Sequence, residues 1–178
     1  MRNFVLVALV LVLVVGCGSS PTASELIENY RNAPQSFEAL RVAITEDSGD
    51  RKCFAIGLDH IGDYWKYGES WTHENDYKTK LTTNQVLSSL DISLNRYEYY
   101  KDLFAATGSE RVTYCKSGRH YVPSVYVMVY RAGLGVSGCM GNINWSSELP
   151  PNRGKRGEGD FVENTPIEDG WYLAYECT

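Results

Sequence analysis

The cysteines carry the clearest chemical signal in this chain of 178 residues, which contains five of them. Cys17 directly follows an N-terminal apolar run, and the remaining four are Cys53, Cys115, Cys139 and Cys177. Four remaining cysteines in an exported chain favour structural pairing, because an oxidising compartment promotes disulfide formation. The sequence therefore predicts two disulfides and no catalytic thiol.

The N-terminal segment predicts export and attachment to a lipid. Arg2 precedes an apolar run in which residues 5–15 are all aliphatic. This run is long enough for the core of a signal peptide and shorter than the ~20 residues that a membrane span needs. The end of the run resembles the lipobox of bacterial lipoproteins, with the residues Leu13-Val14-Val15-Gly16-Cys17.

The lipobox resemblance implies cleavage after Gly16 and acylation of Cys17 with diacylglycerol and a fatty acid such as palmitate. Two or three acyl chains hold a protein firmly to a bilayer. We expect a signal peptide at 1–16, a lipidated tether at 17–24 and a single domain at 25–178. Lipoproteins of this kind are retained in the inner membrane by an Asp after the cysteine. Gly18 stands there, so the outer membrane is favoured, with a body in the periplasm or at the cell surface.

The charge of the mature chain excludes some partners. Removal of 1–16 takes away one basic residue, Arg2, and leaves 17 − 1 = 16 basic against 22 acidic side chains, a net charge of −6. Nucleic acids and anionic membrane surfaces select basic faces. We therefore expect no nucleic-acid partner; the expected partners are the membrane, through the anchor, and an envelope protein or the cell wall.

Motifs for a cofactor, a metal or a nucleophile are incomplete. Gly133, Gly135 and Gly138 match G-x-G-x-x-G, but no helix is expected after them to receive a pyrophosphate. Ser137 lacks the last glycine of a nucleophile elbow. The histidines lack the spacing of a zinc site; they are His60, His73 and His120. The sequence thus assigns no catalytic residue, cofactor or metal ligand.

Aromatic side chains are in excess, with 13 Tyr and 4 Trp. Such residues suit recognition surfaces because they bury a large area with little loss of rotamer freedom. The alternative is a core in which Tyr replaces Phe and its hydroxyl reaches water. The candidate partner surface combines an aromatic strand with a basic loop, namely Tyr64, Trp65, Tyr67, Trp71, Arg153, Lys155 and Arg156.

Three classes of function fit these features. The first is a non-catalytic binding module of the cell envelope. The second is an enzyme that acts on peptidoglycan or glycans, which needs paired carboxylates; the cluster to consider is Asp59, Asp63, Glu69 and Glu74. The third is an exclusion or inhibitor lipoprotein.

Apolar periodicity predicts the elements that must position these residues. Thr22–Glu25 has capping-box spacing and starts a short helix that ends before Pro34. Period-two alternation predicts a hairpin over 39–45 and 54–58, followed by a strand at 64–67. A long helix is expected between 83 and 106, with a later start at 89–91 as an alternative.

Strands dominate the rest of the chain. They are expected at 111–116, 124–131, 134–145 and 171–177, with an exposed loop at 150–160. The predicted fold is α+β: an antiparallel sheet of about six to seven strands packed by one long helix and a shorter N-terminal helix. If the first three of these strands lie side by side, Cys115 and Cys139 are too far apart to bond. Two pairings remain open, 53–115 with 139–177 and 53–139 with 115–177.

The C-terminal third resembles uncharacterised proteobacterial lipoproteins that share a GxGVSG-like turn and a closing WYL strand. The matching residues lie in 132–138 and 167–173, and Cys139 with Met140 departs from the small or polar residues of that pattern. The resemblance implies a location and a fold type but no activity.

Overall fold

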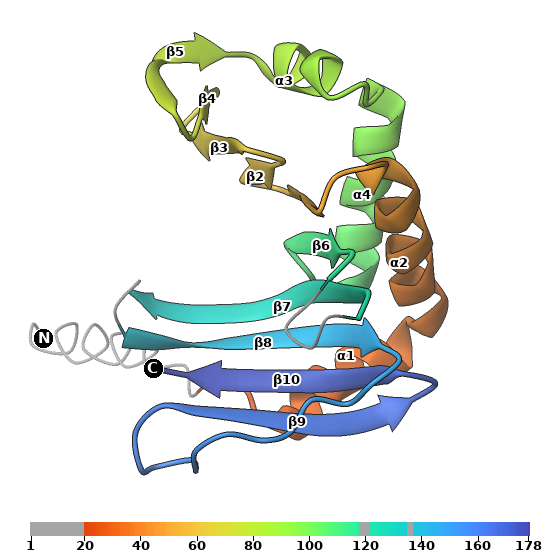
Figure 1. Ribbon diagram of the computed structural model, residues 1–178, viewed down its shortest axis with the longest axis vertical. Helices are drawn as coiled ribbons and strands as arrows, with labels where there is room; N and C mark the ends of the chain where they lie inside the picture. Colours follow the sequence, from red (N-terminus) through yellow and green to blue (C-terminus); the bar gives the residue numbers. More distant parts are fainter. Residues whose placement is uncertain (1–19, 118–121, 135–136) are drawn as a thin grey trace, which may run out of the picture.

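One antiparallel sheet organises the computed structural model, which describes residues 20–117, 122–134 and 137–178. Its ten strands have the order β5-β4-β3-β2-β1-β6-β7-β8-β10-β9 (Figure 1). The strands are β1 (Cys53–Gly57), β2 (His60–Ile61), β3 (Tyr64–Tyr67), β4 (Ser70–His73), β5 (Asp76–Leu81), β6 (Arg111–Cys115), β7 (Ser124–Leu134), β8 (Ser137–Ser146), β9 (Phe161–Glu168) and β10 (Trp171–Cys177). The helices of the described residues are α1 (Ala23–Asn32), α2 (Pro34–Ser48), α3 (Thr83–Ser89) and α4 (Leu94–Thr107).

The expected architecture of about six to seven strands and one long helix is wrong, because the described residues contain ten strands and four helices. The largest error concerns 39–45, which belongs to α2 and not to a strand. Leu40 and Ile44 are four residues apart. Residues with this spacing lie on the same side of a strand and also on the same side of a helix. Phe37 completes that helical stripe; all three are buried, whereas Val42 is 41% exposed.

The segment expected as a single long helix is two helices. Leu90 caps the end of α3, and Asp91 adopts a positive φ of 59°, which turns the chain. The Ser93 hydroxyl then accepts a hydrogen bond from the backbone N–H of Arg96 at 3.1 Å and starts α4. The later start that the sequence left open is therefore the better description.

The additional strands carry weak sequence signals. β2 has only two residues, and β5 is exposed along nearly its whole length, so neither buries one face in alternation. β9 contains Pro166 near its end and lies at the edge of the sheet, where a missing N–H is tolerated. Propensity and periodicity therefore underestimate the size of this sheet.

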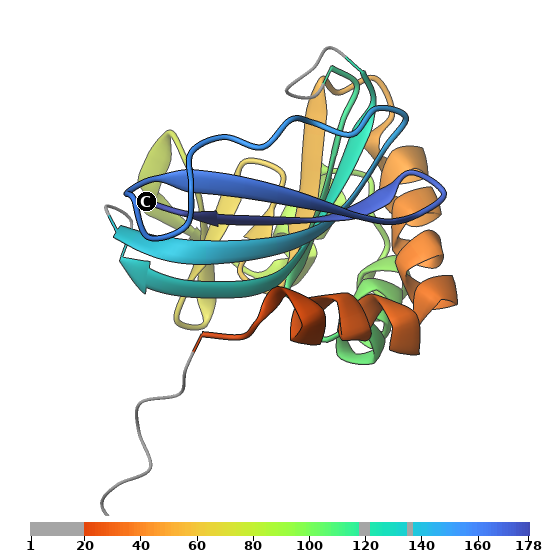
Figure 2. The ribbon, with the colours of Figure 1, turned by 90° about the horizontal axis from the view of Figure 1, so that it is seen from below.

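One face of the sheet packs against helices α1, α2 and α4 (Figures 1 and 2). Alternate residues of the central strands supply its apolar side chains, which are Phe54, Ile56, Val112, Val125, Val127, Ile143 and Leu173. Helix α2 contributes Phe37, Leu40 and Ile44 to the same core. An aromatic cluster fastens α1 and α2 to the sheet: the ring centroids of Tyr30 lie 5.4 Å from those of both Phe37 and Trp171.

Two disulfides link neighbouring strands, as predicted. Cys53–Cys115 joins β1 to β6 and Cys139–Cys177 joins β8 to β10, each with a Cα–Cα distance of 4.1 Å. The first of the two open pairings is therefore the one observed. The expected order β6-β7-β8 is also confirmed, and it separates Cys115 from Cys139 as argued.

Within α2, two aliphatic residues distinguish the helix from the strand expected there. Ile44→Ala should lower the free energy of unfolding by about 2–5 kcal/mol, since the side chain is fully buried. Val42→Ala should cost less than about 0.5 kcal/mol, because Val42 faces solvent. Urea unfolding followed by circular dichroism measures both, and equal losses would contradict the helix.

Candidate functional site

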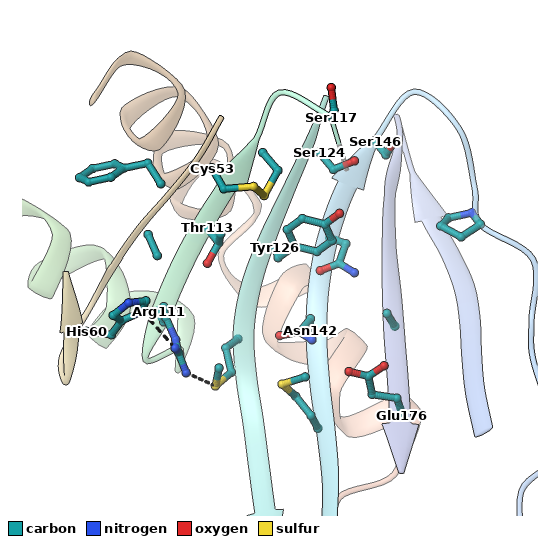
Figure 3. Close-up of a pocket in the computed structure, with 18 of the residues that line it drawn as sticks. Cys53, His60, Arg111, Thr113, Ser117, Ser124, Tyr126, Asn142, Ser146 and Glu176 are labelled. Atoms are coloured by element: carbon teal, nitrogen blue, oxygen red, sulfur yellow. Dashed lines mark hydrogen bonds between the residues drawn. A yellow bond between two sulfur atoms is a disulfide. The ribbon is translucent and has the colours of Figure 1, made fainter. Parts of the chain in front are cut away.

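The face of the sheet opposite the helices is hollow. A cavity of about 1690 Å³, which we call the groove, opens over β1, β6, β7, β8 and β10. Figure 3 looks into the groove, with the helices behind the sheet. Its floor consists of the alternate residues that point away from the core, since successive side chains of a strand face opposite sides.

The strand register arranges the floor in rows. In the first row Arg111, Met128, Asn142, Ala174 and Asn164 stand opposite one another on β6, β7, β8, β10 and β9. All five line the groove. Neighbouring strands lie ~4.8 Å apart, so this row spans roughly 20 Å. A ligand across it meets a cation, a thioether and the amide of Asn142, while the amide of Asn164 donates to the carbonyls of Pro150 and Pro151.

The second row runs parallel to the first and is richer in aromatic and polar groups. Ala55, Thr113, Tyr126, Asn144 and Tyr172 stand opposite one another across β1, β6, β7, β8 and β10. Asn144 is 3% exposed, and its Oδ1 accepts no hydrogen bond from the described residues. An unpaired buried amide oxygen costs about 1–3 kcal/mol, which a ligand donor in the groove would recover.

Arg111 is the central cation of the groove. Its Nη1 bonds to Nδ1 of His60 at 3.2 Å, and its Nη2 donates to the sulfur of Met128 at 3.8 Å (Figure 3). Its Nε is buried without a partner in the described residues. Thioether sulfur is a weak acceptor, and no carboxylate of the described chain lies within 4.0 Å of this guanidinium.

Glycine on the neighbouring strand gives Arg111 its position. Gly57 stands opposite Arg111 on β1, and a Cβ at Gly57 would lie 2.9 Å from the Cβ of Arg111. The bare backbone lets the arginine reach across β1 to His60 on β2. There His60 stacks on Trp65 at 4.0 Å, and the Arg111 guanidinium lies 5.5 Å from the centroid of the same indole.

The protonation of this cluster follows from burial. Burial, and then the charge of Arg111, lower the pKa of His60, so its ring is neutral at pH 7 and Nδ1 accepts the arginine N–H. Burial also lowers the pKa of Arg111. The nearby carboxylates of Asp59 and Glu110 each lie 2.9 Å from nitrogens of Arg131, which therefore takes both.

Charged side chains border the rest of the groove. Three further cations, Arg51, Lys52 and Arg153, line it, together with the carboxylates of Asp63, Glu74 and Glu176. With Arg111, four cations face three carboxylates, although the whole chain carries a net charge of −5. The groove is thus the less acidic part of an acidic protein.

The four aromatic residues predicted to form one surface lie in different environments. Trp65 lines the groove and Tyr67 is 56% exposed, so both are accessible. Tyr64 is half-buried and accepts a hydrogen bond from Ser89 at 3.2 Å. Trp71 is 1% exposed and donates to the hydroxyl of Thr83 at 3.0 Å, so its side chain belongs to the core and offers nothing to a partner.

The three basic residues of the predicted loop also lie in different environments. Arg153 lines the groove and is held by paired backbone hydrogen bonds to Val162. Lys155 lies at the surface, 3.8 Å from Glu158. Arg156 forms an ion pair with Glu163 at 3.1 Å and lies over the rings of Phe161 and Tyr175. Only Arg153 therefore contributes to the groove.

The carboxylates considered for catalysis do not form one cluster. Asp59 is engaged by Arg131, and Glu69 lies in the exposed turn between β3 and β4. Asp63 and Glu74 both line the groove, and the backbone N–H of Glu74 donates to the carbonyl of Asp63 at 2.9 Å. Within the described ranges, no group of three or more His, Cys, Asp or Glu side chains is placed to hold a metal ion.

Sequence reasoning missed Arg111, Asn142 and Asn144. A signal for the two asparagines was present, since Asn142 and Asn144 flank Ile143 and so alternate polar and apolar along one strand. Arg111 gave no signal, because its importance depends on Gly57, which is 54 residues earlier in the chain. Cys17, Gly135 and His120 lie outside the described residues.

No protein-family model, curated protein or solved structure matches this chain. Among the helices of the described residues, none has the length and apolarity to span a membrane.

Gly57 provides a direct test of the packing that positions Arg111. Gly57→Ala should lower the free energy of unfolding by about 1–3 kcal/mol, because its Cβ would overlap both the Arg111 side chain and the Glu110 carbonyl oxygen, each 2.9 Å away. Chemical denaturation of the purified protein measures the loss. A variant as stable as the wild type would contradict the close contact.

Proposed function

We propose that the protein is a lipid-anchored, non-catalytic binding module of the bacterial cell envelope and that its ligand lies in the groove. The observation that carries this proposal is the polar floor, in which Asn144 is buried with an unpaired oxygen beside the half-buried Arg111. Binding sites typically present such a small set of convergent polar groups within a concave surface. This supports recognition in the groove, which Trp65 of the aromatic strand also lines, over recognition by the exposed part of that strand.

The anchor and the groove are compatible with one another. Position 17 is six residues before Ala23, where α1 begins. α1 packs on the face of the sheet that is opposite the groove. A lipid on Cys17 would therefore hold the domain by its helical face and leave the groove accessible.

Glycan hydrolysis is the second candidate, favoured by the presence of both Asp63 and Glu74 in the groove wall. Two carboxylates flanking a glycosidic bond are the usual requirement for this reaction. Asp63→Asn and Glu74→Gln should each abolish product release from peptidoglycan if the protein is an enzyme. A binding module releases no product in any form.

Acylation at Cys17 is tested in cells. The wild type should incorporate radiolabelled palmitate and fractionate with the outer membrane. Cys17→Ala should incorporate none and leave the membrane fraction, because two or three acyl chains supply nearly all of the membrane affinity. A Cys17→Ala variant that remains fully membrane-bound would contradict the anchor.

The location of the ligand is tested with a photo-cross-linking amino acid in the full-length lipoprotein in intact cells. Substitution of Thr113, on the groove floor, should give adducts that mass spectrometry can identify. The matched position is Ala105, which is exposed on α4 at the other face of the sheet and should give none. Adding Ala174→Trp, which fills the groove, should remove the Thr113 adducts; adducts from position 105 alone would contradict the proposal.

A further inference from the structure

Resting on the proposed function, we infer that the ligand of the groove is an acidic oligosaccharide. A sugar carboxylate binds the terminal nitrogens of Arg111, while hydroxyl groups bond to Asn142, Asn144 and Thr113. This inference rests on one arrangement. Arg111, which has no carboxylate partner in the described chain, lies beside two rows of amide and hydroxyl side chains.

Arg111 has donors to spare for an anion. A guanidinium has five N–H groups, and the contacts within the described residues use two of them, on a neutral imidazole and a thioether. Each terminal nitrogen retains a further N–H. Carboxylates accept such paired donors in a planar, charge-assisted arrangement that is stronger than either present contact. The His60–Trp65 stack forms the wall beside it.

The spacing of the floor suits a ligand longer than one sugar. Asn142 stands two strands from Arg111 in the first row, or roughly 10 Å at ~4.8 Å per strand. Asn144 lies two residues further along β8, in the second row between Tyr126 and Tyr172. The carboxylate and the hydroxyl groups therefore come from successive sugar units.

The chemistry of the floor favours a sugar over a peptide. Peptides commonly add to the exposed edge of a sheet through backbone hydrogen bonds. The strands under the groove centre, β6, β7, β8 and β10, are interior and pair on both sides, so their ladders are complete. What they present are amides and hydroxyls, which both donate and accept, as the hydroxyls of a sugar do. The rings of Trp65 and Tyr126 line the groove and offer apolar surface for the C–H faces of sugar rings.

The charge around the groove is consistent with an anion. Arg51, Lys52 and Arg153 lie at its border. Together with Arg111 they outnumber the three lining carboxylates by one, whereas the whole chain carries a net charge of −5. Asp59 and Glu110 compete little for Arg111, because Arg131 binds both.

The test uses two acidic tetrasaccharides and titration calorimetry with the full mature lipoprotein in detergent. One probe is a peptide-free tetrasaccharide of peptidoglycan with free lactyl carboxylates, and the other is a tetrauronate. Each is compared with its neutral form, in which the carboxylates are amidated. At least one acid should bind, and its neutral form should bind about ten- to a hundredfold more weakly, the range expected for a lost charge-assisted hydrogen bond. The arm that binds identifies the source of the carboxylate.

Variants assign the preference to a residue. Arg111→Gln should bind the acid and its neutral form with equal affinity, and Arg111→Lys should restore part of the preference. Asn144→Ala should weaken both forms by a similar factor. Arg31→Gln removes an exposed arginine of α1 outside the groove and should leave all affinities unchanged.

Each remaining outcome is decisive. Equal binding of acid and neutral forms by the wild type would overturn the carboxylate site and leave the groove as a sugar-binding site. Binding of a peptidoglycan stem peptide, with no binding of either sugar, would overturn the choice of a saccharide and keep the groove as a ligand site. If neither sugar nor peptide binds, the inference of an acidic oligosaccharide is wrong. The proposed function is tested separately by the cross-linking experiment, and adducts at position 105 with none at position 113 would contradict it.

Discussion

The pairing of β1 with β6 is the contact on which the rest of this structure depends. It joins segments about 60 residues apart through five paired positions and the Cys53–Cys115 disulfide, whose cysteines are 62 residues apart. Closing a loop of that length is entropically costly, and a disulfide across it removes about 4 kcal/mol of that cost from folding. The pairing unites the β2–β5 end with the β7–β10 end in one sheet. It also sets Gly57 against Arg111, without which the arginine has no path to His60.

The two faces of the sheet follow from the alternation along its long strands. On β7 and β8, Val125, Val127 and Ile143 enter the core, while Tyr126 and Asn142 project into the groove. A solvated second face is common in antiparallel sheets, but burying Asn144 there costs stability unless its amide is bonded. The floor retains this group beside Arg111, whose hydrogen-bond partners in the described chain are a neutral imidazole and a thioether. Such a floor is suited better to a ligand than to a second layer of core.

The features that the sequence predicts correctly depend on residues close together in the chain. The features that it does not predict depend on packing between distant segments. The capping box of α1 forms as expected: the backbone N–H of Glu25 donates to the Thr22 hydroxyl at 3.2 Å, and the Glu25 carboxylate accepts from the Thr22 N–H. The β6-β7-β8 meander also follows from runs and turns in the chain. α2 was missed because Leu40 and Ile44 satisfy both periods, and Phe37 decides between them only when the sheet it packs against is known. The surface position predicted for Trp71 is wrong, because a single strand does not reveal which of its faces α3 covers.

The proposed anchor restricts where the ligand can be. Position 17 lies six positions before Ala23, so the chain between them spans at most roughly 20 Å. With Cys17 acylated, the domain would stay within that distance of the bilayer. The groove lies on the face of the sheet opposite α1, the helix that follows the tether, so this attachment is compatible with an open groove. An acidic glycan of the envelope is a polymer that could reach such a groove, and the chemistry of the floor favours the same class of partner.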